Sequence, residues 1–426
     1  MLFRSEIYSQ LYGNLSITLI KILLNSHLQS FTPLYFMRAF IEALDSTGIR
    51  INQNQQTKKI LQFLLQEGGK TIPEIRDFSR LSLPTSTKLV AELLEQNILI
   101  ESGKRESSGG RPPSLYSLNP EMGYIVGVEL LLKSFRMSII NLNHEVIYEY
   151  ETDSFDISNR EESYQFLVTT VPNIIERRGI SQDKILGVGI GITGRVDRRQ
   201  GISHSYLNYE KPLVTLLSEQ WNFPVFIDND THLMALGEQS FGLAKEEPNV
   251  LYLNLSRGLG LGFISNGIIH NGKSGFAGEF GHIHFENNEK KCVCGKKGCL
   301  ETVVSGIALE NLYQEATKNK KELVRYKNIL QLVRSGDPLA SNLLSTMSEK
   351  LGQALSILVQ VLNPSIIILG GRFAQVGEFM RYPMARGLSL YGLPQLVSDC
   401  EIKISTLGEK TTMLGAYAMV IENVFR

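Results

Sequence analysis

The pattern of apolar and polar positions after Gly123 predicts an α/β protein. Short apolar runs bounded by turn residues alternate with longer stretches of helical periodicity, as in sheets covered by helices. No internal repeat and no low-complexity tract is evident in the sequence. Strands are expected at 124–129, 135–140, 145–150, 185–190, 225–227, 250–255, 261–264 and 366–369, and helices at 160–177, between 305 and 362, and at 411–424.

Before Gly123 the pattern changes to short helices followed by a hairpin. An apolar helix containing Ile60 and Leu64 ends at Gly68-Gly69, and Thr71-Ile72-Pro73-Glu74 has the form of a capping box with Pro in the first turn. The sequence Ser82-Leu83-Pro84 opens a third helix. Strands at 98–100 and 115–118 can then pair around the loop 104–113.

Two short helices joined by a tight turn, with small polar residues and a Lys starting the second, describe a helix-turn-helix. The following Gly-Gly-Arg-Pro sequence is slim and cationic, so it can act as a wing that lays Arg111 into a minor groove. A generic three-helix packing module and a solvated loop are the alternatives. The residues expected to contact DNA are Thr85, Ser86, Thr87, Lys88, Lys104, Arg105, Gly110 and Arg111.

A chain of 426 residues is too long for one ordinary core, so several domains are expected. Residues 1–50 have helical apolar spacing and are interpreted as an accessory helical extension, followed by a polar linker at 52–56. A helix-turn-helix domain with a wing is expected at 57–120. The α/β domain is expected at 122–426.

Composition and charge constrain the partners. The 43 basic and 43 acidic residues cancel, so net charge gives no support for a nucleic-acid partner and any basic surface must be local. The apolar stretch at 11–44 is interrupted by polar and charged residues, and it resembles neither a membrane span nor a signal peptide. Four cysteines imply no disulfide framework, so we expect a cytoplasmic protein.

The stretch from Gly278 to Glu301 has the densest metal-binding chemistry in the chain. Cys292, Cys294 and Cys299 lie close together, with His282 upstream, and three thiolates with one imidazole form a closed structural Zn²⁺ site. Gly residues between the second and third thiols let the chain curl around an ion. Buried, unreactive cysteines are the alternative.

The sequence Asp228-Asn229-Asp230 lies where a strand is expected to end and a helix to begin, which is where ligands bind α/β sheets. Adjacent carboxylate and amide groups suit a polyhydroxylated ligand. A simple helix N-cap explains the same residues equally well. Two glycine-containing stretches, 191–196 and 256–262, are weaker candidates for backbone contact with a ligand.

The sequence Gly-Glu-x-Gly-His followed by Cys-x-Cys-Gly-x-x-Gly-Cys-x-Glu resembles the signature of the ROK family of repressors and sugar kinases, and the resemblance extends from about Thr57 to the C-terminus. It implies a winged helix-turn-helix followed by a two-lobed, actin-like (ribonuclease-H-like) ATPase fold with a zinc knuckle, with hinges near 230 and 405. It also implies structural zinc on His282, Cys292, Cys294 and Cys299. The implied sugar contacts are Gly194, Arg195, Asn229, Asp230, Glu279, His282 and Glu301.

Two departures from the family pattern favour a regulator over a kinase. Kinases hold nucleotide phosphates with Asp-x-Gly-Gly-Thr, but the corresponding run here is Glu129-Leu130-Leu131-Leu132-Lys133. The second phosphate loop of the kinases carries Gly-Thr-Gly, while this chain has Arg257-Gly258-Leu259-Gly260 and lacks the hydroxyl. We therefore expect a sugar-controlled, dimeric or larger DNA-binding repressor of carbohydrate genes without enzymatic activity. The alternative is an ATP-dependent kinase of the glucokinase or N-acylhexosamine kinase type with an appended DNA-binding domain, in which Asp230 would be the base.

Overall fold

The computed structural model describes residues 51–105, 112–285, 287–318 and 323–424. The expected accessory helix at 1–50 lies outside these described residues. The chain forms two compact units, of which the first runs to Tyr124 and includes the segments Asn141–Asn143 and Asn173–Leu186. The second unit holds Ile125–Ile140, His144–Pro172 and everything from Gly187 onward. Across the described residues, no helix combines the length and apolar character that a membrane crossing requires.

Between residues 51 and 122, the described part of the first unit contains three α-helices and an antiparallel hairpin. The predicted capping box at the start of α4 is confirmed, because the Thr71 side chain accepts from the Glu74 N–H while Glu74 accepts from the Thr71 N–H. The predicted polar linker at 52–56 is wrong. Those residues form the first turns of α3, since Gln is a good helix former and the apolar face of the helix follows directly. The elements are α3 (Ile51–Glu67), α4 (Ile72–Ser79), α5 (Leu83–Glu95), β1 (Leu99–Lys104), β2 (Ser114–Leu118) and η1 (Pro120–Met122).

The second unit is built around two five-stranded sheets of the same topology. In the first sheet the strand order is β5-β4-β3-β6-β9, and in the second it is β12-β11-β10-β13-β14. Each begins with three consecutive strands and adds two later strands, and β6–β9, β10–β13 and β13–β14 are parallel pairs. The fold therefore contains a structural repeat, although the sequence shows none.

The strands of both sheets agree with the predicted ones, with added short strands and a last strand, β14, that the sequence did not predict. The first sheet contains β3 (Tyr124–Leu130), β4 (Phe135–Asn141), β5 (Val146–Thr152), β6 (Ile185–Ile192) and β9 (Val225–Asn229), with the small pair β7 (Val196–Asp197) and β8 (Ile202–Ser203) beside it. The second contains β10 (Val250–Leu255), β11 (Leu259–Ser265), β12 (Ile268–Ile269), β13 (Ile366–Gly370) and β14 (Glu401–Ile404).

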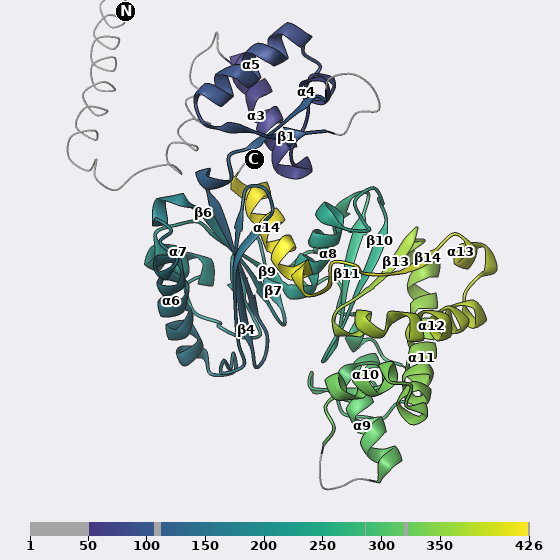
Figure 1. The fold of residues 1–426 in the computed structure, drawn as a ribbon. Coiled ribbons are helices and arrows are strands. Elements are labelled where there is room, and N and C mark those ends of the chain that lie inside the picture. The colour runs from purple at the N-terminus through teal and green to yellow at the C-terminus, as the bar shows by residue number, and fades with distance from the viewer. Residues whose placement is uncertain (1–50, 106–111, 286, 319–322, 425–426) are drawn as a thin grey trace, which may run out of the picture. The chain divides into compact units, whose positions relative to one another are not determined.

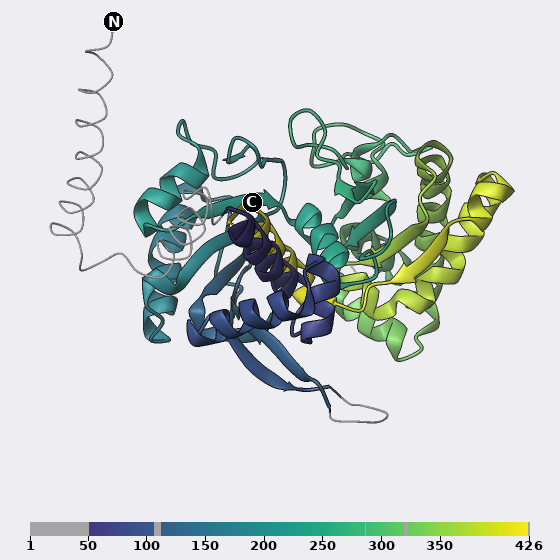
Figure 2. The same cartoon turned by 90° about the horizontal axis from the view of Figure 1, so that it is seen from above.

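Helix α14 (Thr411–Val424) packs between the two sheets, as Figures 1 and 2 show. It crosses α8 (Asp230–Phe241) closely, because a Cβ on Gly415 would come within 1.8 Å of the Leu233 carbonyl oxygen. A Cβ on Gly189 of β6 would come within 2.6 Å of the Ala416 carbonyl oxygen. Only glycine fits at these crossings. The chain passes from the first sheet to the second through α8, near the hinge predicted at 230, and continues from β14 into α14 near the one predicted at 405.

The remaining helices cover the outer faces of the sheets. Leu351, Leu355, Met380 and Met384 are among the side chains that form the main core beneath α11 and α12 against the second sheet. These elements are α6 (Arg160–Arg177), α7 (Leu213–Trp221), α9 (Gly306–Thr317), α10 (Tyr326–Arg334), α11 (Pro338–Leu362), α12 (Gly377–Tyr391) and α13 (Pro394–Ser398), with 3-10 turns η2 (Gln182–Lys184), η3 (Phe280–His282), η4 (Leu300–Thr302), η5 (Arg372–Val376) and η6 (Gly408–Lys410).

Candidate functional site

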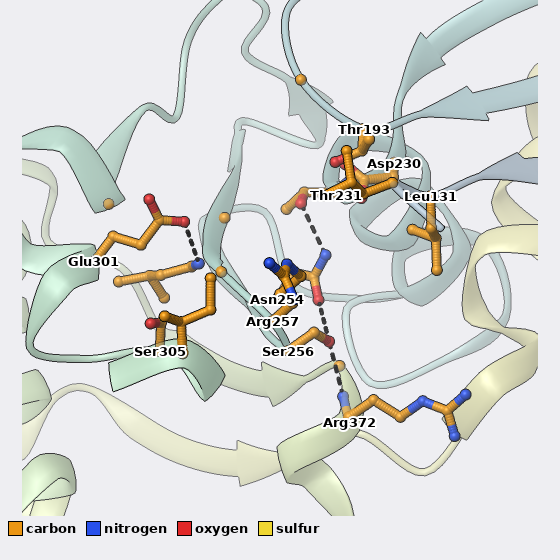
Figure 3. A pocket seen from close by; sticks show the side chains of 18 of the residues that line it. Leu131, Thr193, Asp230, Thr231, Asn254, Ser256, Arg257, Glu301, Ser305 and Arg372 are labelled. Atoms are coloured by element: carbon orange, nitrogen blue, oxygen red, sulfur yellow. Dashed lines mark hydrogen bonds between the residues drawn. The ribbon is translucent and has the colours of Figure 1, made fainter. Parts of the chain in front are cut away.

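A cavity of about 1210 Å³ opens in the second unit where strands of both sheets end. Thr193 follows β6, Asp230 follows β9, Asn254 lies near the end of β10 and Arg372 follows β13, and all four line the cavity. Figure 3 shows their side chains around the same space. All the predicted sugar contacts also line this cavity: Gly194, Arg195, Asn229, Asp230, Glu279, His282 and Glu301.

Asn229 is the N-cap of α8. Its Oδ1 accepts from the N–H groups of Thr231 and His232, and its Nδ2 donates to the Gly194 carbonyl at 2.8 Å. The helix N-cap that the sequence offered as an alternative is therefore present at Asn229. It leaves one N–H of the amide for any ligand.

Asp230 begins α8 and its side chain is buried at the cavity wall. Burial, reinforced by the nearby Glu129 carboxylate, raises the pKa of Asp230 to about 7. The Thr231 N–H donates to its Oδ1. Near neutral pH this carboxyl group is therefore poised either to accept or to donate a hydrogen bond.

The four predicted metal ligands converge. The imidazole of His282 and the thiols of Cys292, Cys294 and Cys299 offer ligand atoms that all lie within 4.8 Å of one another. The Cys294 and Cys299 Sγ atoms are 3.5 Å apart, and His282 Nδ1 is 3.5 Å from Cys292 Sγ. Ligand atoms of a tetrahedral site are roughly 3.5 to 4 Å apart, so this set fits a metal ion.

Two glycines shape the metal-binding loop. Gly295 and Gly298 have φ of +88° and +83°, and a Cβ on Gly298 would lie 2.4 Å from the His284 ring. The predicted tight curl between the second and third thiols is confirmed. Burial, followed by the neighbouring thiols, raises the pKa of Cys299 to about 12, and a bound cation is what would allow all three thiols to ionise.

Glu301 connects the metal cluster to the cavity. Its Oε1 accepts from the Leu259 N–H at 3.3 Å, and its Oε2 lies 3.8 Å from His282 Nδ1. The other ring nitrogen of His282, Nε2, is 3.7 Å from Glu279 Oε2. One imidazole thus faces the thiols on one side and a cavity carboxylate on the other.

The end of β3 contains the first of the two sequences that differ from the kinase pattern, and it lines the same cavity as Asp230. Glu129 at the end of β3 is fully buried, accepts from Thr412 Oγ1 at 2.6 Å and lies 3.4 Å from Arg136. Burial raises the pKa of Glu129, and Arg136 opposes that rise. Arg136 also pairs with Glu151 at 2.9 Å and Glu409 at 3.3 Å. Leu131 and Leu132 also line the cavity, so this end of β3 offers apolar side chains and neutralised charges.

Sequence reasoning missed a chain of polar groups that spans the cavity floor. Asn254 donates to Thr231 Oγ1 at 3.1 Å, Ser256 Oγ donates to Asn254 Oδ1 at 3.0 Å, and the Arg372 N–H donates to Ser256 Oγ at 3.0 Å (Figure 3). Thr231 belongs to α8, Asn254 and Ser256 lie at and just after the end of β10, and Arg372 belongs to η5, and no sequence signal links these three segments.

His232 was also missed. It is buried, with Nδ1 3.1 Å from Asp228 Oδ1 and Nε2 3.1 Å from the Ala277 carbonyl oxygen. It therefore holds the segment that precedes Glu279 against α8. The spacing of four residues between Asp228 and His232 at a predicted helix start was the available signal.

The residues predicted to contact DNA lie in the first unit, and one prediction is wrong. Thr85, Thr87 and Lys88 at the start of α5 are exposed, but Ser86 is fully buried, because it lies on the same helix face as Leu89 and Val90. Ser86 therefore cannot contact DNA from this conformation. Lys104 is exposed and Arg105 pairs with Glu74 at 2.8 Å, while Gly110 and Arg111 lie outside the described residues.

Comparisons with known proteins identify the family of this chain. The model of the ROK family matches residues 125–423. The xylose repressor of Bacillus spizizenii is 29% identical over 90% of this chain and 98% of its own length, and the glucokinase of Halalkalibacterium halodurans is 27% identical over 68% of this chain and 93% of its own. A solved ROK family transcriptional regulator, a homologue of the Escherichia coli MLC protein, has the same fold, with a TM-score of 0.71 at 24% identity over 87% of this chain and 96% of that one. The chain therefore belongs to the ROK family.

Proposed function

We propose that this chain is a sugar-responsive transcriptional repressor of carbohydrate genes. The observation that supports it best is the extent of the matches. The xylose repressor aligns with 90% of the chain, whereas the glucokinase aligns with 68%. The family model begins at residue 125 and does not cover the helices and hairpin of the first unit. A kinase of this family does not need these elements.

In this proposal residues 57–120 are a winged helix-turn-helix that binds operator DNA, and residues 122–426 are the sensor. Helix α5 presents Thr85, Thr87 and Lys88 to a major groove, and the β1–β2 hairpin is the wing. Lys104, Arg105, Gly110 and Arg111 supply the contacts of the wing to phosphates and the minor groove. Such a protein acts in the cytoplasm, where its operator lies.

The effector binds in the cavity, against the wall formed by Gly194, Arg195, Asn229, Asp230, Glu279, His282 and Glu301. Carboxylates and amides on this wall match the hydroxyl groups of a sugar. Zinc on His282, Cys292, Cys294 and Cys299 is structural and fixes the imidazole that faces Glu279. A sugar that prefers one arrangement of the two sheets, with movement near 230 and 405, must shift operator affinity by the same coupling free energy.

The test is a binding titration of the full chain against the DNA upstream of its own gene, with and without xylose, glucose or N-acetylglucosamine. We expect salt-dependent operator binding that one of the sugars weakens at least tenfold. Binding that no sugar alters would contradict the sensor role.

The variant Lys88→Ala tests the DNA contact. Loss of one phosphate contact should weaken binding to all sequences and lower the slope of log affinity against log salt by about 1. Lys403→Ala, a surface lysine on β14, is the matched control and should leave the slope unchanged.

A kinase is the second candidate, because Asp230 remains at the cavity wall with a pKa near 7, as a catalytic base requires. We propose that the chain lacks this activity, since Glu129 and its Leu neighbours replace the phosphate-holding turn. A coupled assay of sugar-dependent ADP formation should give no signal above that of Asp230→Asn. A sugar-dependent rate that Asp230→Asn abolishes would favour the kinase.

A further inference from the structure

The beginning of α5 (Figure 1) carries an exposed surface that is largely apolar. Leu83, the first residue of the helix, is 48% exposed, and Pro84, Thr85 and Thr87 are exposed as well. Leu89, on the other side of the helix, is buried in the core of the first unit. Because Leu83 and Thr87 are four residues apart, they lie on one face of the helix. We call Leu83, Pro84, Thr85 and Thr87 the exposed turn of α5.

The hydroxyl groups of the exposed turn already have partners within the chain. The Thr87 hydroxyl donates to the Leu83 carbonyl oxygen at 2.9 Å, and a hydroxyl group has only one proton to donate. The Thr85 Oγ1 lies 2.7 Å from Ser82 Oγ, which also accepts from the Thr85 N–H. Leu83 and Pro84 have no hydrogen-bonding group in their side chains. The exposed turn therefore offers a partner mainly carbon atoms.

Cationic side chains precede and follow the exposed turn. Arg80 is exposed between α4 and α5 and has no carboxylate partner among the residues that the structure describes. The Lys88 side chain is 74% exposed, and its Nζ lies 3.8 Å from a Glu92 carboxylate oxygen. An exposed ion pair of this kind is weak, so Lys88 can exchange Glu92 for a phosphate. This charge pattern matches the phosphates that border a groove of DNA.

The major groove of DNA offers one apolar group to such a surface, the C5-methyl group of thymine. The other base edges in this groove present hydrogen-bond donors and acceptors. Leu83 packed against those edges would remove their water without replacing its hydrogen bonds, which is unfavourable. Packed against a thymine methyl group, the same side chain buries apolar surface on both molecules.

We propose that Leu83 and Pro84 contact thymine methyl groups, so that an operator half-site has T·A base pairs where the start of α5 enters the major groove. The inference rests on the proposed DNA-binding function and names the bases that this helix selects. Arg80 and Lys88 hold neighbouring phosphates, which carry no sequence information.

The test uses the full chain and the operator located by footprinting upstream of its own gene. Each thymine of one half-site is replaced in turn by deoxyuridine, which lacks only the C5-methyl group and keeps the hydrogen-bonding groups. We expect about fourfold weaker binding at one or two positions, the loss that corresponds to one buried methyl group. Leu83→Ala should bind the original operator less tightly than the parent protein and show no further loss at one of these positions.

The variant Ile147→Ala is the matched control. Ile147 is 46% exposed, as Leu83 nearly is, but it lies on β5 of the second unit, so this variant should keep the sensitivity of the parent protein. Leu83→Arg gives a second measurement, because Arg donates two hydrogen bonds to guanine. It should bind a duplex with G·C in place of the sensitive T·A pair about tenfold more tightly than the original operator.

Two groups of outcomes separate this inference from the function on which it rests. Operator binding that deoxyuridine alters at no position would overturn the inference and leave the DNA-binding function intact. A Leu83→Ala protein with full sensitivity at every position, or a Leu83→Arg protein that keeps the preference for T·A, would overturn it too. A parent protein that binds none of the upstream DNA would contradict the proposed function itself, and the inference with it.

Discussion

The carboxylates that line the cavity fall into two groups with different partners. Asp230, Glu279 and Glu301, the proposed sugar contacts, have no Lys or Arg partner among the residues that the structure describes. Glu129 and Glu409 share the guanidinium of Arg136, and Glu409 also pairs with Arg372. The first group keeps free hydrogen-bonding capacity, and the second has used much of it within the chain.

This difference concerns what each group of residues can bind. A nucleotide brings negative charge that cations and a glycine turn must hold. Arg136 already pairs with three carboxylates, and Leu131 lines the cavity where the kinase pattern has a glycine. A neutral polyol needs hydrogen-bonding groups instead, and the first group of carboxylates provides them.

The largest expected effect comes from the His282 and cysteine cluster next to the proposed sugar contacts. Cys299→Ser removes a buried ligand, so zinc content should fall from about one ion per chain to near zero and the melting temperature should drop sharply, because structural zinc binding contributes directly to folding. Metal analysis and differential scanning calorimetry measure both. Cys400→Ser changes a buried cysteine outside the cluster and should leave the zinc content intact. A parent protein without bound metal would contradict the assignment.

The second effect is at the ion pair of Arg136 with Glu129. Arg136→Met leaves the buried Glu129 carboxylate without its main cation, which should cost about 3 to 5 kcal/mol of unfolding free energy at pH 8. Burial raises the pKa of Glu129, so the folded variant binds a proton more readily than the unfolded chain, and its stability should recover as the pH falls towards 5. Urea unfolding at both pH values measures this. Lys211→Met, which breaks a surface pair with Glu219, is the control and should change little.

The smallest effect has the opposite sign. The pKa of Asp230 is about 7 in the folded protein and near 3.8 in water, so the folded state binds more protons between these values and loses stability as the pH rises through them. Asn cannot ionise, so Asp230→Asn removes this loss of folding stability. The substitution should raise the unfolding free energy by up to about 4 kcal/mol at pH 8 and by much less at pH 4. A gain that does not depend on pH would show that burial of this carboxylate is not its cause. Urea unfolding across this range measures the gain.

Several parts of this site could be predicted from the sequence because their signals are local. Thiol spacing with intervening glycines indicates a metal loop wherever it occurs, and Asp228-Asn229-Asp230 at a strand end places polar groups at a sheet edge. The capping box at Thr71 and Glu74 depends on contacts within one turn of helix. The strand pattern likewise indicated an α/β fold.

Other parts could not be predicted, because they depend on which elements meet. Ser86 reads as a surface residue of a recognition helix, but the angle at which α5 packs places it in the core. The prediction of a linker at 52–56 was wrong because these residues extend α3. Such an extension depends on whether the apolar face that follows it is buried, as it is in α3.

By itself the sequence determined most of the strands and helices, the loop that brings His282 and the cysteines together, and the residues proposed to contact a sugar, because each signal depends on groups that are neighbours along the chain. Tertiary structure decided the repeated sheet topology, the close crossing of α14 with α8 at Gly415, and the pairing of Glu129 with Arg136. The hydrogen bond from Thr412 to Glu129 joins residues 283 positions apart. Contacts over such distances form only when both sheets have folded against α14, so no local pattern records them.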